Sequence, residues 1–433
     1  MKLSCVLLVS FAWVGMGASA VALDAPQTLH HTKTPHLVEP RPKGKSTATH
    51  AGAKATARTA STHAQATPSQ GSRKTGSRSA TVRRTRLGVH RRYYERFSAS
   101  SFATGDIFAG DIIAGEDPVV RQAAIDALGD MNGTAVVIDP SNGRILAMVN
   151  QKLALSPGAE PCSTIKLTVA MAALSEGLVT RDTMVQLPGF RMNMTQALAK
   201  SNNLYFEELG RELGFERVRH YANQFGLGEL AGYNIEGEQL GVYPDEEIPA
   251  AEGGVGRMCS FGQGVSMTPM QLGAYVAALA NGGTLYYLQH PTSAEEAAAF
   301  EPRVKRTLDI GRFVPDLQDG MAGAVEYGTA RSLRASFREF PVFGKTGTCS
   351  DKGTRFGWFA SYSDSPQGSL VTVFFLEGGR PTFGPRAAEL TGAFYRNLWD
   401  RNYFAEKTQT AATLTPVSTK LDTQPAASGS ANQ

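Results

Sequence analysis

Hydrophobic and polar positions follow two periods along this chain, and the period changes from one predicted element to the next. From Pro118 to Leu128, apolar residues recur three and four positions apart and stop before a glycine, which predicts a helix. Thr134 to Asp139 and Arg144 to Val149 are apolar runs on either side of Pro140-Ser141-Asn142-Gly143. Two such runs around turn-forming residues predict a strand hairpin.

The helical period returns at Ser163 and persists until Gly177, a residue suited to end a helix. Thr268-Pro269 opens a further predicted helix, with threonine as N-cap and proline in the first turn. Three strand-like segments and an amphipathic helix complete the pattern: Val342-Phe343, Arg355 to Tyr362, Leu370 to Leu376, and roughly Pro385 to Leu398. This order of elements predicts an α+β fold, an antiparallel sheet with a helical cluster.

The two ends of the chain lack this patterning. Residues 1–20 combine a lysine, an apolar run and a small-residue cleavage pattern, which predicts a secretory signal peptide; retention as a membrane anchor is the alternative. Residues 21–96 and 405–433 contain few large apolar side chains, so we predict that both are disordered. Between them we expect a lead-in with one helix at 97–130 and a folded domain at 131–404.

Charge is divided unevenly along the chain. Residues 24–96 carry 15 Lys/Arg and 3 Asp/Glu, a balance of about +12, whereas residues 97–433 carry 27 and 36, a balance of about −9. The basic segment is interpreted as a solvated spacer, with weak attraction to anionic envelope polymers as the alternative. Its histidines lack a tight metal-ligand spacing.

Three short motifs occur in order within the patterned region: Ser163-Thr164-Ile165-Lys166, Ser201-Asn202-Asn203 and Lys345-Thr346-Gly347. Each is weak alone, because the chain also contains Lys74-Thr75-Gly76 and Ser430-Ala431-Asn432 where no structure is predicted. The first motif, however, contains the only serine–lysine pair of this spacing in the chain. Context supports all three: the first opens a predicted helix, the second precedes one, and the third ends a strand-like run.

The spacing of Ser163 and Lys166 suits nucleophilic catalysis. Residues three apart share a helix face, so the lysine amine can reach the serine hydroxyl. A seryl hydroxyl needs a base to become a good nucleophile. A lysine can be that base only when neutral, and burial or a neighbouring cation such as Lys345 lowers its pKa. Ser163 at a helix N-terminus also places backbone N–H groups toward developing negative charge. The alternative is an N-cap serine with an exposed lysine.

With these motifs the chain resembles the transpeptidase domain of penicillin-binding proteins, which is related to the serine β-lactamases. Further segments carry the resemblance over roughly residues 130–400: Phe225-Gly226-Leu227-Gly228 with Gly237-Glu238, Gly262-Gln263-Gly264, Thr268-Pro269-Met270-Gln271-Leu272, Ala280-Asn281-Gly282-Gly283, Gly328-Thr329-Ala330 and Phe356-Gly357-Trp358-Phe359. The resemblance implies an α+β domain with an antiparallel five-stranded sheet flanked by helices, plus a helical subdomain.

The resemblance also implies a role for each motif residue. Ser163 would be acylated by a D-alanyl-D-alanine stem peptide of peptidoglycan, or by penicillin. Ser163 and Thr348 would supply the backbone N–H pair of the oxyanion hole. Ser201 would relay protons between Lys166 and the leaving amine, and Asn203 would hold the substrate amide and the Lys166 amine.

The third motif would bind the other end of the substrate. Its terminal carboxylate would be held by a cation with adjacent hydroxyl donors, namely Lys345, Thr346 and Thr348. Gly347 would let the substrate backbone lie against the strand edge. No metal, organic cofactor or nucleic-acid partner is expected.

Two features depart from the family pattern. Cys162 stands where these proteins usually have glycine or alanine, and Cys349 directly follows the third motif. We expect Cys162, Cys349 and Cys259 to be buried small residues; a disulfide between two of them and reactive thiols are the alternatives. The second departure is that the stretch before residue 130 has no room for the N-terminal domain of larger relatives, so we expect a stand-alone domain. From the signal-peptide pattern we expect it to be exported to the periplasm or cell envelope.

Three functions remain open. The first is a D,D-transpeptidase or D,D-carboxypeptidase acting on peptidoglycan. The second is an oxacillinase-like β-lactamase, in which water removes the same acyl group; Asn203 and the Gly262-to-Leu272 stretch favour the first. The third is a non-catalytic β-lactam sensor domain.

Overall fold

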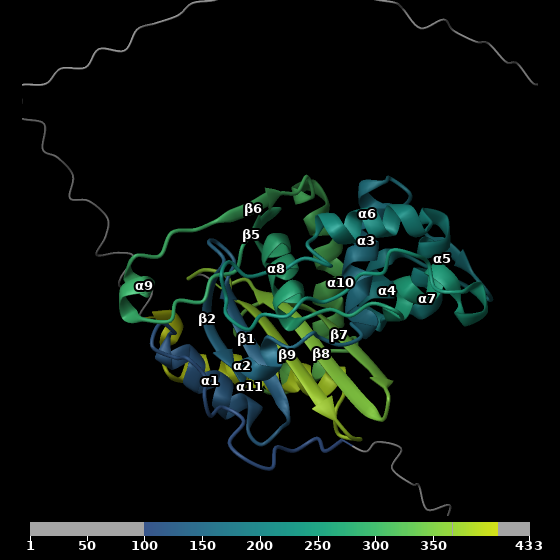
Figure 1. Cartoon of the computed structure of the whole chain (residues 1–433). Helices are drawn as coiled ribbons and strands as arrows, with labels where there is room; N and C mark the ends of the chain where they lie inside the picture. Colours follow the sequence, from purple (N-terminus) through teal and green to yellow (C-terminus); the bar gives the residue numbers. More distant parts are fainter. Residues whose placement is uncertain (1–98, 366, 406–433) are drawn as a thin grey trace, which may run out of the picture. The chain divides into compact units, whose positions relative to one another are not determined.

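The computed structural model describes residues 99–365 and 367–405. A five-stranded sheet in the order β2-β1-β9-β8-β7 runs through it, and every neighbouring pair is antiparallel (Figure 1). The strands are β1 (Gly133–Asp139), β2 (Arg144–Val149), β7 (Val342–Asp351), β8 (Thr354–Ser363) and β9 (Val371–Gly378). The early hairpin therefore joins the three late strands through the β1–β9 pair, and the predicted fold class is confirmed. The predictions for the signal peptide, the basic segment and the C-terminal tail lie outside the described residues.

The β7–β8 hairpin is longer than its apolar pattern indicated. The strand predicted at Val342-Phe343 continues through the third motif to Asp351. A two-residue turn at Lys352 and Gly353, with φ of 45° and 80°, closes the hairpin. Since β7 is an outermost strand of the sheet, the third motif lies on a strand edge and not beyond the strand's end.

Two helices, α1 (Pro118–Leu128) and α11 (Gly384–Asp400), cover one face of the sheet (Figure 1). Asp117 caps α1 by accepting hydrogen bonds from the N–H groups of Val119 and Val120, and the helix predicted there is confirmed. Apolar and aromatic side chains fill this layer, among them Val120, Ala124, Val137, Phe359, Phe374 and Phe394. Burying a large apolar side chain contributes about 1.5–3 kcal/mol, so this layer is a firm support behind the sheet.

A helical region covers the other face (Figure 1). Its α8 (Pro269–Ala280) packs on β1, β8 and β9 and begins with reciprocal capping between Thr268 and Gln271, which confirms the predicted N-cap. At Gly273 an added Cβ would lie 2.7 Å from Ile138 Cδ1, which shows how closely the helix approaches the sheet. Beside α8 lies α3 (Lys166–Ser175), which is buried from Lys166 to Leu174.

Shorter elements complete the described fold. The remaining helices are α2 (Gln151–Ala154), α4 (Met194–Lys200), α5 (Asn203–Leu213), α6 (Phe215–Gln224), α7 (Gly254–Phe261), α9 (Ala294–Ala298) and α10 (Val314–Glu326). Two small antiparallel pairs join β3 (Val185–Leu187) to β4 (Phe190–Met192) and β5 (Thr284–Tyr286) to β6 (Val304–Thr307). None of the helices in residues 99–365 and 367–405 has the length and apolar character needed to cross a bilayer.

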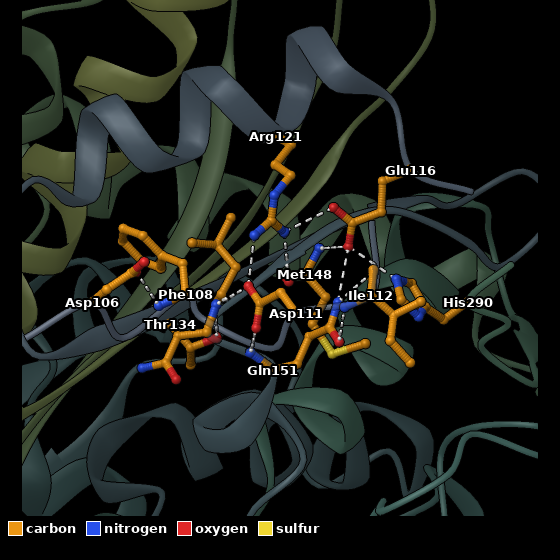
Figure 2. Close-up of polar contacts among 12 residues, drawn as sticks. Asp106, Phe108, Asp111, Ile112, Glu116, Arg121, Thr134, Met148, Gln151 and His290 are labelled. Carbon is orange, nitrogen blue, oxygen red and sulfur yellow. Dashed lines mark hydrogen bonds and ion pairs between the residues drawn. The ribbon is translucent and has the colours of Figure 1, made fainter. Parts of the chain in front are cut away.

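A buried ion cluster fastens the segment before α1 to the rest of the domain. Arg121 donates hydrogen bonds to Asp111 Oδ2 at 2.7 Å and to Glu116 Oε2 at 2.9 Å. Glu116 Oε1 lies 2.9 Å from His290 Nε2, and the Asp111 and Glu116 side chains are only 4% and 1% exposed. Figure 2 shows Arg121 next to both carboxylates, with His290 on the other side of Glu116. The cluster therefore links the 111–121 stretch to His290, far along the sequence.

The same segment satisfies the outer edge of β2. Glu116 Oε1 accepts a hydrogen bond from the Met148 N–H at 2.9 Å, and the Asp117 N–H donates to Leu146 O at 2.8 Å. Because β2 is an outermost strand, these backbone groups have no neighbouring strand to pair with on that side. The segment before α1 supplies partners that a further strand would otherwise provide.

Candidate active site

The first motif forms the N-terminal turn of the α3 segment. Residues Cys162–Ile165 form a 3-10 helix, η1, and Lys166 begins α3. The helix predicted from Ser163 is present, although its first turn is of the tighter kind. Lys166 Nζ lies 2.9 Å from Ser163 Oγ. Lys166 is fully buried and Ser163 is half-buried, so the amine lies behind a hydroxyl that a ligand can reach.

The second motif lies in the turn between α4 and α5. Ser201 ends α4 with a φ of 53°, a left-handed conformation that is uncommon for serine, and Asn202 caps α5 by accepting the Tyr205 N–H at 3.0 Å. This turn directs three oxygens at Lys166 Nζ: Ser201 O at 3.1 Å, Ser201 Oγ at 3.3 Å and Asn203 Oδ1 at 2.6 Å. The backbone at Ser201 thus determines where the side chains of this motif lie.

The third motif brings a second amine to the same point. Lys345 Nζ donates to Ser201 Oγ at 2.8 Å and to Thr346 O at 2.9 Å. Ser201 Oγ therefore lies between the amines of Lys345 and Lys166. Since Lys345 is fully buried, its charge acts from behind Ser201 and the strand edge.

The two threonines of β7 alternate with Lys345 and point to the other side of the strand. Thr346 Oγ1 lies 2.7 Å from Thr329 Oγ1, and Thr348 Oγ1 accepts the N–H of Gly384 at 2.8 Å. A hydroxyl that accepts a hydrogen bond keeps its own proton for donation. Thr346 is buried and Thr348 half-buried, so Thr348 is the more accessible of these two donors.

Burial changes the protonation of both lysines. It lowers the pKa of Lys166 well below the ordinary 10.5, and the charge of Lys345 lowers it further, whereas the Glu207 carboxylate acts in the opposite direction. Burial also lowers the pKa of Lys345 to about 7. A neutral Lys166 amine beside Ser163 Oγ is able to remove the hydroxyl proton.

The register of β7 directs the Thr348 N–H toward the free edge of the sheet. In an antiparallel hairpin, hydrogen-bonded and non-hydrogen-bonded pairs alternate from the closing turn. Asp351 and Thr354 flank the two-residue turn as the first bonded pair, so Thr348, opposite Gly357, occupies a non-bonded position. The Ser163 N–H belongs to the first turn of a helical segment, where such groups lack an intrahelical acceptor. These two groups are the donor pair that the family resemblance implies for an oxyanion hole.

A disulfide joins the first motif to the third. Cys162 and Cys349 are bonded, with their Cα atoms 5.6 Å apart, while Cys259 is a buried free thiol. The expectation of three unpaired small residues was therefore wrong, because the two motifs converge closely enough to bring two thiols into bonding range. The backbones of the two motifs also approach closely at Gly347, since an added Cβ there would lie 2.8 Å from Pro161 O.

Known proteins share this domain. A family model described as the penicillin binding protein transpeptidase domain matches residues 133–392. This chain belongs to the penicillin-binding protein transpeptidase family. Among its relatives is stage V sporulation protein D of Bacillus subtilis, 28% identical over 61% of this chain and 48% of the relative. The peptidoglycan D,D-transpeptidase MrdA of Acinetobacter baumannii is 25% identical over 62% of this chain and 50% of that protein.

A solved structure agrees with the fold of this penicillin-binding domain. Pseudomonas aeruginosa PBP2, in complex with WCK 5153, matches with a TM-score of 0.55 and 23% identity, covering 67% of this chain and 75% of that one. At that identity the likeness supports the fold alone. The chain spans about half the length of the two curated relatives named above.

Three residues at the site of this penicillin-binding domain were not among the predicted ones. Thr329 belongs to the Gly328-Thr329-Ala330 segment, so the family resemblance was the available signal for its contact with Thr346. Gly384 and Glu207 carry no sequence signal, because their nearness to the motifs depends on how α11 and α5 pack. Within residues 99–365 and 367–405, no three His, Cys, Asp or Glu side chains gather as metal ligands would.

Proposed function

We propose that this chain is a serine D,D-transpeptidase or D,D-carboxypeptidase that acts on D-alanyl-D-alanine stem peptides of peptidoglycan, and that β-lactams acylate the same serine. The observation that carries the proposal is the buried Lys166 amine, 2.9 Å from Ser163 Oγ and with its pKa lowered by burial and by Lys345. A lysine held in this way is a general base for the adjacent hydroxyl.

Acylation would begin with proton transfer from Ser163 Oγ to Lys166 Nζ as the oxygen attacks the penultimate D-alanine carbonyl. The carbonyl oxygen gains negative charge, and the N–H groups of Ser163 and Thr348 would stabilise it. Such donors act strongly because they are already oriented before the reaction; losing one costs about 10²–10³ in rate.

The leaving amine needs the proton that Lys166 has taken. Ser201 Oγ, 3.3 Å from Lys166 Nζ and 2.8 Å from Lys345 Nζ, is positioned to pass it on. Asn203 Oδ1 would hold Lys166 by its 2.6 Å contact, leaving the amide N–H₂ group of Asn203 to bind a substrate carbonyl.

The substrate carboxylate would bind along β7. The hydroxyls of Thr346 and Thr348 would donate to it, and the buried Lys345 would add positive charge from behind the strand edge. Gly347 would permit the substrate backbone to lie against this edge.

We also propose where the protein works. The relatives named for peptidoglycan D,D-transpeptidase activity support export, which the signal peptide at residues 1–20 would direct to the periplasm or cell envelope. The basic segment 21–96 would then be a spacer, followed by the lead-in at 97–130 and the transpeptidase domain at 131–404.

Mass spectrometry of the chain after incubation with labelled penicillin tests the function. We expect one persistent adduct on the peptide that contains Ser163, and release of D-alanine from a stem pentapeptide. Ser163→Ala should give no adduct, whereas Ser141→Ala, in the exposed β1–β2 turn, should label as the parent does. Rapid loss of the adduct would favour a β-lactamase, an adduct without D-alanine release a sensor, and no adduct at all would contradict all three.

The pH dependence of acylation is a second prediction. Deprotonation of Lys166 should raise the rate with increasing pH, and loss of the Lys345 charge that attracts the carboxylate should lower it as pH passes about 7. Stopped-flow measurement of penicillin acylation across the neutral range would show both limbs. In Lys345→Arg the cation persists throughout the measured pH range, so the alkaline limb should move upward. An unchanged limb would mean that another group causes it.

A further inference from the structure

The disulfide connects the two residues that adjoin the expected oxyanion donors. Cys162 directly precedes Ser163, and Cys349 directly follows Thr348. The bonded cysteines are separated by 187 positions in sequence, yet their Cα atoms lie 5.6 Å apart. The disulfide therefore joins two distant segments next to the Ser163 and Thr348 N–H groups, which must point to the same oxygen.

The two segments pack closely, but polar restraints that join them directly are few. Across the described residues, no hydrogen bond runs from Cys162–Ile165 to any residue of β7. Polar contacts reach across through other elements: Trp358 Nε1 of β8 donates to Glu160 O at 3.1 Å, and Ser201 Oγ lies between the amines of Lys166 and Lys345. Close packing brings the segments together, since an added Cβ at Gly347 would lie 2.8 Å from Pro161 O. The disulfide is the covalent link between them.

The backbone of Cys162 adds a second reason. Its φ of 52° lies in the left-handed region, which residues with a Cβ rarely adopt. The peptide group after Cys162 carries the Ser163 N–H, so rotation of the Cys162 backbone toward negative φ would turn that N–H and shift Ser163. Because the Cys162 side chain is bonded to Cys349 of β7, the disulfide opposes this rotation of the Cys162 backbone.

We propose that the Cys162–Cys349 disulfide is a positioning element of the oxyanion hole: the oxidised chain holds the Ser163 and Thr348 N–H groups on one point, and the reduced chain acylates more slowly. This inference rests on the proposed acyl-enzyme function. Lys166 and Lys345 keep their places in the reduced chain, since Ser201 and Asn203 hold them independently of the disulfide.

Reduction by a dithiol has a defined course. Cys162 is fully buried and Cys349 half-buried, so we expect a reductant thiolate to attack at Cys349. The S–S bond breaks, Cys162 leaves as a thiolate and takes up a proton, and Cys349 stays in a mixed disulfide with the reductant. The second thiol of the reductant attacks that bond, which frees Cys349 and yields the cyclic disulfide. Two electrons and two protons pass to the cysteine pair, and an added disulfide oxidant reverses the process.

The third thiol does not interfere. Cys259 is fully buried against α5, where Gly210 is so near that an added Cβ would lie 2.6 Å from its Sγ. Burial raises the pKa of the Cys259 thiol far above its usual range, so its thiolate is scarce. A denatured sample should therefore titrate two more thiols after reduction than before, and that difference measures the state of the disulfide.

The test compares acylation by a fluorescent penicillin in oxidised, dithiol-reduced and re-oxidised wild-type chain. We expect the first-order acylation constant to fall at least about tenfold on reduction, toward the 10²–10³ typical of a lost oxyanion donor, and to return on re-oxidation. The dissociation constant of the noncovalent complex should stay the same, and so should the midpoints of both limbs of the pH–rate profile. The double variant Cys162→Ala with Cys349→Ala should have the acylation constant of the reduced chain, both with and without reductant. Cys259→Ala should respond as the parent does.

The outcomes separate the two proposals. Equal acylation constants in oxidised and reduced chain would overturn the positioning role while leaving the acyl-enzyme intact. A slower reduced chain that also loses its circular dichroism signal, or loses noncovalent binding in proportion, would assign the bond to folding and likewise overturn it. Failure of the oxidised wild-type chain to form any adduct would instead refute the proposed function.

Discussion

Replacing Lys166 with alanine should slow acylation of Ser163 by a β-lactam about 10²–10⁴-fold, the usual contribution of a general base. The physical reason is that Lys166 Nζ is the basic nitrogen 2.9 Å from Ser163 Oγ, and its burial keeps the amine neutral at a pH where an exposed lysine is charged. Single-turnover kinetics with a chromogenic β-lactam, followed by intact-mass analysis, would measure the effect.

Two control variants distinguish a role of Lys166 as a base from a role as a positive charge alone. Lys166→Arg retains a positive charge that does not dissociate near neutral pH, so it should be about as slow as Lys166→Ala. Lys200→Ala removes an exposed lysine next to Ser201 and should acylate as the parent does. If Lys166→Ala formed the acyl-enzyme at the parent rate, the proton would have to go to another group.

The largest expected effect on stability comes from Arg121→Met, which should lower the free energy of unfolding by about 3–5 kcal/mol. The substitution leaves Asp111 and Glu116 almost fully buried without their cation, and a buried unpaired charge is costly. Urea denaturation of the oxidised chain, monitored by circular dichroism, measures the change.

The matched control is Arg401→Met. Arg401 also pairs with a carboxylate, Asp126, at 2.6 Å, but both side chains are more than a third exposed, so the loss should stay within about 1 kcal/mol. Adding Asp111→Asn and Glu116→Gln to Arg121→Met should recover part of the stability, since neutral amides cost less to bury. Equal effects of Arg121→Met and Arg401→Met would mean that burial does not govern the strength of these pairs.

Much of the secondary structure could be predicted because it depends on local patterns. The helix over Pro118–Leu128 has its cap, its period and its terminal glycine within a dozen residues. The β1–β2 hairpin and the capping of α8 are local in the same sense. Strand β7 ended too early in the prediction because Lys345 and Thr346 look polar in sequence; tertiary packing buries both.

The candidate site could be predicted only as a set of motifs. Order and context indicated that Ser163, Ser201 and Lys345 belong together, but not that Ser201 Oγ would lie between two amines. The disulfide likewise depends on a separation of 5.6 Å between residues distant in sequence, which no local pattern encodes. The same holds for the ion cluster, in which His290 joins a group formed by Asp111, Glu116 and Arg121.

The segment before α1 has a consequence for how the domain avoids self-association. An outermost strand with bare N–H and C=O groups is a template for pairing with another copy, and such pairing seeds aggregation. Here Glu116 and Asp117 occupy those groups on β2. A shortened chain that began at Gly133 would retain every residue of the family match and the Ile145–Gln289 backbone bond, yet it would lose both of these partners of β2. It would also lose α1, which covers one face of the sheet together with α11. We therefore expect such a shortened chain to be less soluble, although Glu116 and Asp117 lie outside the residues of the family match.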